Sequence, residues 1–126
     1  MGAAETSSIP DPDDFTPGRF PARFPLGPAC WYEPSLGKLV SQGQEILLTP
    51  HQNALLTLLL RAPDHYHKAG DLGVALAEHF GVEEISGQSI KETMRGLRDK
   101  LNQSTAAGVL ETRHGYGYRI VLPKRE

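Results

Sequence analysis

The stretch most informative about the fold of this chain is LETRHGYGYRI, residues 110–120. Two strand-like segments, Val109–His114 and Gly117–Leu122, meet at the tip Gly115-Tyr116-Gly117. Glycines tolerate positive φ and let the backbone approach a partner closely, so they suit the tip of a β-hairpin. The sequence therefore predicts a hairpin whose cations Arg113, His114 and Arg119 either reach an anionic partner or are only solvated, while Tyr118 and Ile120 pack on the helices.

The segment before the hairpin is predicted to be a helix that begins near Ser86–Ser89, where Ser89-x-x-Glu92 has the form of a capping box. Its apolar residues form a narrow stripe at helical spacing: Ile90, Met94, Leu97 and Leu101. The opposite side carries Gln88, Glu92, Arg95, Gly96 and Asp99, and one flank carries Lys91, Arg98 and Asn102. Such a helix fits a DNA major groove. It equally describes a surface helix with internal pairs such as Arg95–Asp99.

Two further helices and four strands are expected nearer the N-terminus. Thr49, Pro50 and Gln52 form a capping box with proline at the first helical position, and that helix ends at Ala62-Pro63. A second helix is expected over residues 69–80, ending at Gly81. Short strands separated by close turns predict an antiparallel meander: Arg23–Leu26, Ala29–Glu33, Lys38–Ser41 and Gln44–Leu47.

Three motifs in this order resemble the OmpR/PhoB winged helix-turn-helix effector domains. LETRHGYGYRI resembles that family's wing signature I-x-T-V-R-G-x-G-Y-R-[FL], with matches at Thr112, Gly115, Gly117, Tyr118 and Arg119. LRDKL, residues 97–101, looks like its L-R-x-K-L, and QGQEILLT, residues 42–49, is similar to its d-G-x-x-[IV]-x-L-T. The resemblance covers about residues 23–122.

The resemblance implies an α+β fold, a winged helix-turn-helix with an N-terminal four-stranded antiparallel sheet, a three-helix bundle and a C-terminal β-hairpin wing. We accordingly expect a DNA-binding domain over residues 23–122, a disordered Pro/Asp-rich tail over residues 1–22 and a basic C-terminal tail over residues 123–126. Most members carry a receiver domain ahead of this module, which residues 1–22 are too few to encode. The expectation is therefore an orphan effector or a piece of a longer regulator.

The function implied is sequence-specific binding of double-stranded DNA by a transcription regulator, with the third helix in the major groove and the wing on the adjacent backbone or minor groove. The expected contacts are Gln88, Lys91, Thr93, Arg95, Arg98, Arg113, His114 and Arg119. In the family, the loop before the third helix touches RNA polymerase, here residues 81–87 with Glu83 and Glu84, and members commonly form head-to-tail homodimers on direct repeats. Three residues depart from the family pattern: Glu92 replaces a small apolar residue, Gly96 an arginine and His114 the wing arginine.

Charge bears on which classes of function remain possible for this chain. The net charge is −2, but residues 1–85 carry five basic and eleven acidic side chains, whereas residues 86–126 carry eight and four. This asymmetry is as consistent with an anionic partner for the C-terminal part as with a solvated helix face and a frayed basic tail. The alternative is a protein–protein interaction module on the same scaffold, which would use the acidic loop or the tail with Phe15 and Phe20.

An enzyme is not expected, and neither are catalytic residues, a metal or a cofactor. Cys30 is the single cysteine and has no identifiable base. Asp64, His65 and His67 have metal-ligand chemistry, but they lie in an expected loop, where exposed histidines are the simpler interpretation. No apolar run is long enough to span a membrane, and no signal peptide is evident, so a cytoplasmic location is expected.

Overall fold

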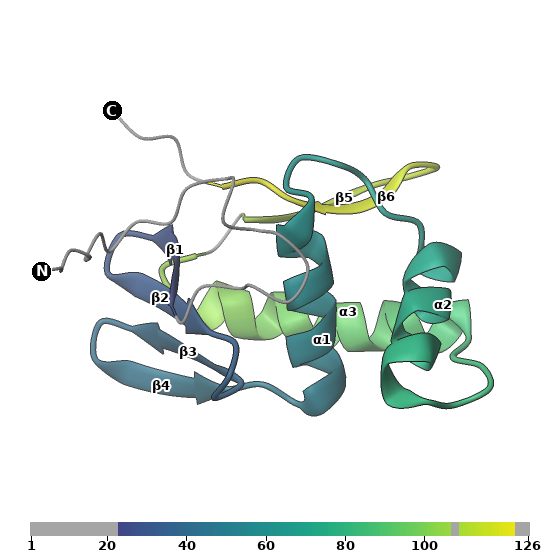
Figure 1. Cartoon of the computed structure of the whole chain (residues 1–126). Coiled ribbons are helices and arrows are strands. Elements are labelled where there is room, and N and C mark those ends of the chain that lie inside the picture. The colour runs from purple at the N-terminus through teal and green to yellow at the C-terminus, as the bar shows by residue number, and fades with distance from the viewer. Residues whose placement is uncertain (1–22, 107–108, 123–126) are drawn as a thin grey trace, which may run out of the picture.

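The computed structural model describes residues 23–106 and 109–122. The tails predicted over residues 1–22 and 123–126 lie outside the described residues. Within the described part, a four-stranded sheet, three helices and a two-stranded hairpin follow one another as predicted for a winged helix (Figure 1). The sheet lies at one end of the third helix and the second helix at the other, with the hairpin running along one side. In the part of the chain that the structure describes, no helix is long and apolar enough to cross a membrane.

The N-terminal sheet is an antiparallel meander in the order β1-β2-β3-β4. Its strands are β1 (Phe24–Gly27), β2 (Cys30–Glu33), β3 (Lys38–Ser41) and β4 (Gln44–Leu47). The first two strands begin one residue later than predicted. Ala29 has a φ of 55°, which places it in the turn rather than in β2. Alternate residues of β1–β3 face the helices, because successive side chains of a strand point to opposite sides.

Tyr32 connects this sheet to the first helix, α1 (Pro50–Arg61). Its ring is fully buried. Its hydroxyl lies 2.9 Å from the Asn53 carbonyl oxygen, 2.5 Å from Asn53 Oδ1 and 2.9 Å from Thr57 Oγ1. Burial raises the pKa of Tyr32 to about 12, so the hydroxyl remains protonated and can donate to the Asn53 oxygens, while either hydroxyl can donate in the contact with Thr57.

The predicted capping box at the start of α1 is confirmed, and its Gln52 side chain also contacts the third helix. Thr49 Oγ1 accepts from the Gln52 amide at 3.2 Å, and Gln52 Oε1 accepts from the Thr49 amide at 2.9 Å. Lys100 also donates to Gln52 Oε1 at 2.9 Å. Gly96 packs against the same side chain, since a Cβ there would lie 2.6 Å from Gln52 Nε2. The prediction that Gly96 faces away from the bundle is therefore wrong, and its missing side chain is explained by packing against α1.

The second and third helices are α2 (Ala69–Phe80) and α3 (Gly87–Gln103). As predicted, α2 ends at Gly81, which has a φ of 69°. The capping box predicted at Ser89 is wrong: Ser86 is the N-cap of α3, and its hydroxyl accepts from the Ser89 amide at 3.1 Å. Ser89 thus lies in the first turn rather than before it. The predicted apolar stripe of α3 is confirmed, with Ile90, Met94, Leu97 and Leu101 all buried.

A close contact fixes α2 against the segment that leads into α3. In α2, Gly73 and Ala77 are buried, whereas Ala75 and Phe80 are half-buried. A Cβ at Gly73 would lie 2.4 Å from the carbonyl oxygen of Ile85. Glycine is therefore required here by backbone packing, and the turn between the two helices depends on it.

We predict that Gly73→Ala lowers the free energy of unfolding by about 1–3 kcal/mol, the usual cost of overpacking, even though alanine favours a helix. Urea denaturation measures this change. Gly70→Ala is the matched control, because a Cβ at Gly70 meets nothing within 4 Å. Equal stability of the two variants would contradict the packing role of Gly73.

Candidate nucleic-acid interface

The outer face of α3 presents two cations that are free to bind a partner. Lys91 and Arg95 are exposed, and they share a face because residues four apart on a helix are neighbours. Within the described residues, neither side chain makes a hydrogen bond or an ion pair, and the Arg95–Asp99 pair does not form. The polar side chains around them are also accessible: Gln88, Glu92, Asp99 and Asn102 are exposed, and Thr93 and Arg98 are half-buried.

The hairpin consists of β5 (Leu110–Arg113) and β6 (Gly117–Ile120), and its tip is exposed. Arg113 and His114 lie at this tip, together with Tyr116. Gly115 has a φ of 83°, as expected for a tight turn. Gly117, which was predicted both at the tip and as the first residue of the second strand, pairs with Arg113 as the first residue of β6.

The loop between α1 and α2 forms an isolated antiparallel β-bridge with this hairpin, between His67 and Tyr118. The His67 amide donates to the Tyr118 carbonyl at 2.7 Å, and the Tyr118 amide donates back to the His67 carbonyl at 2.9 Å. A Cβ at Gly117 would lie 2.2 Å from that His67 carbonyl oxygen, and Gly117 has a φ of 114°. Gly117 is thus required by the close approach of the loop. Sequence reasoning missed this pairing and treated the loop as free.

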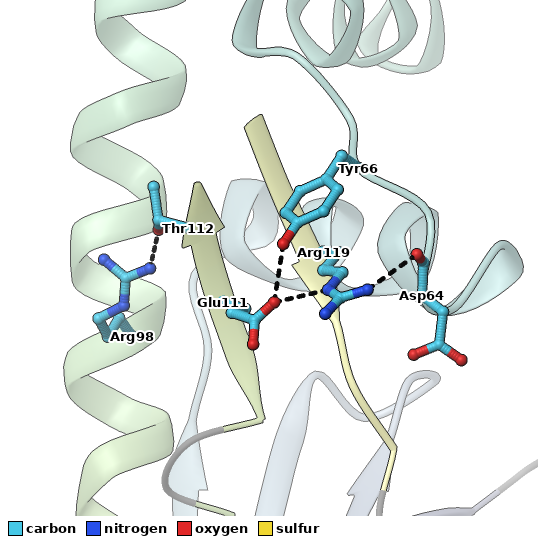
Figure 2. A network of polar contacts seen from close by, with 6 residues as sticks. All are labelled: Asp64, Tyr66, Arg98, Glu111, Thr112 and Arg119. Carbon is cyan, nitrogen blue, oxygen red and sulfur yellow. Dashed lines mark hydrogen bonds and ion pairs between the residues drawn. The ribbon is translucent and has the colours of Figure 1, made fainter. Parts of the chain in front are cut away.

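A hydrogen bond joins the hairpin to α3. The Arg98 guanidinium donates to the hydroxyl of Thr112 on β5 (Figure 2). Arg98 belongs to α3 and Thr112 to the wing signature, so the two predicted binding elements lie side by side. This contact places β5 beside the flank of α3 that carries Arg98.

Arg119 lies at the base of the hairpin rather than free on its surface. Its Nε donates to Glu111 Oε1 at 2.6 Å, and its Nη1 donates to the Asp64 carbonyl at 3.4 Å (Figure 2). The Tyr66 hydroxyl donates to the same Glu111 oxygen at 2.9 Å. The charge of Arg119 is therefore balanced inside the protein, which argues for a supporting role and gives no support to the predicted contact with DNA.

These contacts shift the acid–base properties of the pair. The hydrogen bond from Arg119, and then that from Tyr66, lowers the pKa of the Glu111 carboxyl below its ordinary value. The hydrogen bond to Glu111 raises the pKa of Arg119. Because both shifts favour the charged forms, the pair is stabilised as an ion pair at neutral pH.

The remaining predicted positions are placed as follows. Glu83 and Glu84 are exposed in the turn between α2 and α3, beside Val82, which is also exposed. Gln88 Nε2 donates to Glu92 Oε2 at 3.5 Å, so the carboxylate of Glu92 lies among polar groups rather than against a cation. Cys30 is buried in the sheet. Within residues 23–106 and 109–122, no three His, Cys, Asp or Glu side chains are grouped so that they would hold a metal ion.

Comparison with known proteins gives a consistent result. A family model described as "transcriptional regulatory protein, C terminal" matches residues 43–120, more than half of the chain. No curated protein matches the chain.

Three similar solved structures illustrate the likeness. The DNA-binding domain of CadC from E. coli is 17% identical, with a TM-score of 0.65 over 79% of this chain and 91% of that one. The C-terminal domain of NsrR, a lantibiotic response regulator for nisin resistance, is 28% identical, with a TM-score of 0.61 over 71% and 89%. The DNA-binding domain of the response regulator AdeR, solved in complex with an intercistronic region, is 17% identical, with a TM-score of 0.61 over 79% and 100%. The first and third likenesses establish the fold alone.

We predict that Glu111→Gln lowers stability at neutral pH and that its difference from the natural chain shrinks in acid. A carboxyl with a lowered folded-state pKa contributes fully above its unfolded value, about 4.3, and the contribution is lost as the pH falls through the lowered pKa. Urea denaturation at neutral and acid pH measures the difference.

Glu84→Gln is the control, since Glu84 is exposed and makes no ion pair within the described part of the chain. It should match the natural chain at every pH. A stability difference for Glu111→Gln that is the same at both pH values would show that the ion pair does not hold the hairpin.

Proposed function

Since the chain belongs to the transcriptional regulatory protein C-terminal family, whose members are DNA-binding domains and not enzymes, we propose that it binds double-stranded DNA in a sequence-specific manner. In this proposal α3 enters the major groove and the β5–β6 wing lies on the adjacent backbone or minor groove. The observation that carries it is the Arg98–Thr112 hydrogen bond, which joins the cationic face of α3 to the wing. A duplex can then meet both elements at once.

The helix supplies both affinity and base readout. Lys91 and Arg95 are exposed and unpaired within the described residues, so they are available to phosphates or to the O6 and N7 acceptors of guanine. Gln88 and Thr93 add neutral hydrogen-bonding groups. Glu92 is the unusual member of this face, because phosphates repel a carboxylate. Its place is explained if it accepts a hydrogen bond from the N4 amino group of cytosine.

The wing supplies contacts outside the major groove. Arg113 and His114 are exposed at its tip, where they face the partner that α3 meets. Arg119 has a different part from the one expected from sequence: it holds the base of the wing through Glu111 and Tyr66. In this proposal Arg119 positions the wing, and Arg113 and His114 make the contacts.

The proposal also includes contacts of this chain with RNA polymerase and the pairing of two copies of the chain on DNA. The turn between α2 and α3 exposes Val82 with Glu83 and Glu84, and an apolar and acidic surface of this kind suits a basic protein partner. This is the surface that the family resemblance assigns to RNA polymerase. Head-to-tail homodimers on direct repeats remain part of the proposal and are tested by the stoichiometry of the complex. A chain that uses only the acidic turn, without binding DNA, is the competing function.

We predict salt-sensitive binding to a short duplex, measured by fluorescence anisotropy. If one copy neutralises about four phosphates, log K falls with log[salt] at a slope of about −3.6, and Arg95→Ala flattens that slope by about 0.9. Arg61→Ala is the matched control, because Arg61 is exposed but lines a groove between α1 and α2. Absence of salt-sensitive binding would reject DNA binding in favour of the competing function.

We further predict that Glu92→Ala relaxes base preference at one position of the site. Selection of bound duplexes from a random library should show a cytosine that the natural chain prefers by about 1–3 kcal/mol and the variant does not. Asp99→Ala, on the same face about two turns later, is the comparison variant. Identical selected sites for the natural chain and Glu92→Ala would remove Glu92 from base readout.

A further inference from the structure

Four side chains form a row across the wing in which cations and aromatic rings are in contact. The Arg113 guanidinium lies over the Tyr116 ring, 4.4 Å from its centroid. The centroids of the Tyr116 and Tyr66 rings lie 5.6 Å apart, and the two ring planes make an angle of 56°. The Arg119 guanidinium lies over the Tyr66 ring at 4.7 Å. We call Arg113, Tyr116, Tyr66 and Arg119 the guanidinium–tyrosine row.

The row is fixed at one end and open at the other. Arg119 is fixed by Glu111, and the Tyr66 hydroxyl is held by the same carboxylate at 2.9 Å. Tyr66 is half-buried, whereas Tyr116 is 52% exposed and Arg113 is exposed. Glu111 therefore holds Arg119 and Tyr66 at the base, Tyr66 contacts the Tyr116 ring, and Tyr116 contacts the Arg113 guanidinium at the tip.

A ring is a suitable support for a cation that must still bind a phosphate. The face of an aromatic ring attracts a guanidinium, and this contact uses none of the five N–H donors. An unsupported arginine at a hairpin tip would lose its rotamer freedom when it binds, which weakens binding. An arginine already held against a ring loses less.

We propose that Tyr66 and Tyr116 are positioning residues for DNA binding, which hold the Arg113 guanidinium in place for a phosphate of the duplex. The proposal rests on the DNA-binding function proposed above and adds two residues that the sequence analysis did not select. Tyr116 occupies the variable position between the two wing glycines, and Tyr66 comes from the loop between α1 and α2.

A double-mutant cycle on duplex affinity tests the proposal. Tyr116→Ala should weaken binding about two- to fivefold, the factor that an exposed cation–π contact represents, and Tyr116→Phe should restore it because the ring is kept. In an Arg113→Ala background, Tyr116→Ala should have no further effect, since the cation that it supports is gone. Additive losses would overturn the proposal, because they would mean that Tyr116 contacts DNA itself or acts only on folding.

A second measurement reads the positioning directly. The ¹⁵N relaxation of the Arg113 side-chain Nε in the free protein should show restricted motion, and Tyr116→Ala should make it as mobile as the exposed Arg61. Unchanged motion in that variant would also overturn the proposal. Failure of the proposed function is distinguishable: the natural chain would then not bind the duplex at all, whereas failure of the row leaves binding intact with additive losses.

Discussion

The backbone of Gly117 lies so close to the carbonyl oxygen of His67 that position 117 has no space for a Cβ atom. A Cβ there would lie 2.2 Å from that oxygen. This approach allows His67 and Tyr118 to exchange two backbone hydrogen bonds, which attach the wing to the loop between α1 and α2. The placement of Tyr66 beside Glu111 and Arg119 depends on the same attachment, because Tyr66 precedes His67 in the loop. The absence of a side chain at Gly117 is therefore one condition for the position of the wing, together with the Arg98–Thr112 and Arg119–Asp64 hydrogen bonds.

The wing position matters because the chain has no general excess of positive charge. Its net charge is −2, so binding of an anionic duplex must rely on local arrangement rather than overall attraction. The pairing of Glu111 with Arg119 contributes to this arrangement. It keeps the Glu111 carboxylate hydrogen-bonded to Arg119, while Arg113 at the tip forms no salt bridge within the described residues and lies over the Tyr116 ring. The Arg98–Thr112 contact then holds β5 beside α3.

Local signals were sufficient for most of the fold. The Thr49 capping box, the Gly81 helix end and the apolar stripe of α3 each depend on residues within a few turns of one another, and all three are present. Contacts between distant segments were not predictable in this way. Gly96 meets Gln52, Arg119 meets Asp64 and Gly117 meets His67 across more than 40 residues in each case. From residue type alone, Gly96 was interpreted as a lost arginine and Gly117 as a turn glycine, whereas the structure shows that both pack closely against a distant segment. The DNA contact of Arg119 stays a prediction.

The central claim is that the outer face of α3 and the wing form one surface for duplex DNA. Amide and arginine side-chain NMR shifts of the labelled protein, followed during titration with a short duplex, test it most directly. The account predicts that the shifts concentrate at Lys91, Arg95, Arg113 and His114, while the β1–β4 sheet and the groove at Arg61 stay unchanged. Shifts confined to the acidic turn at Glu83 and Glu84, or to the sheet, would contradict it.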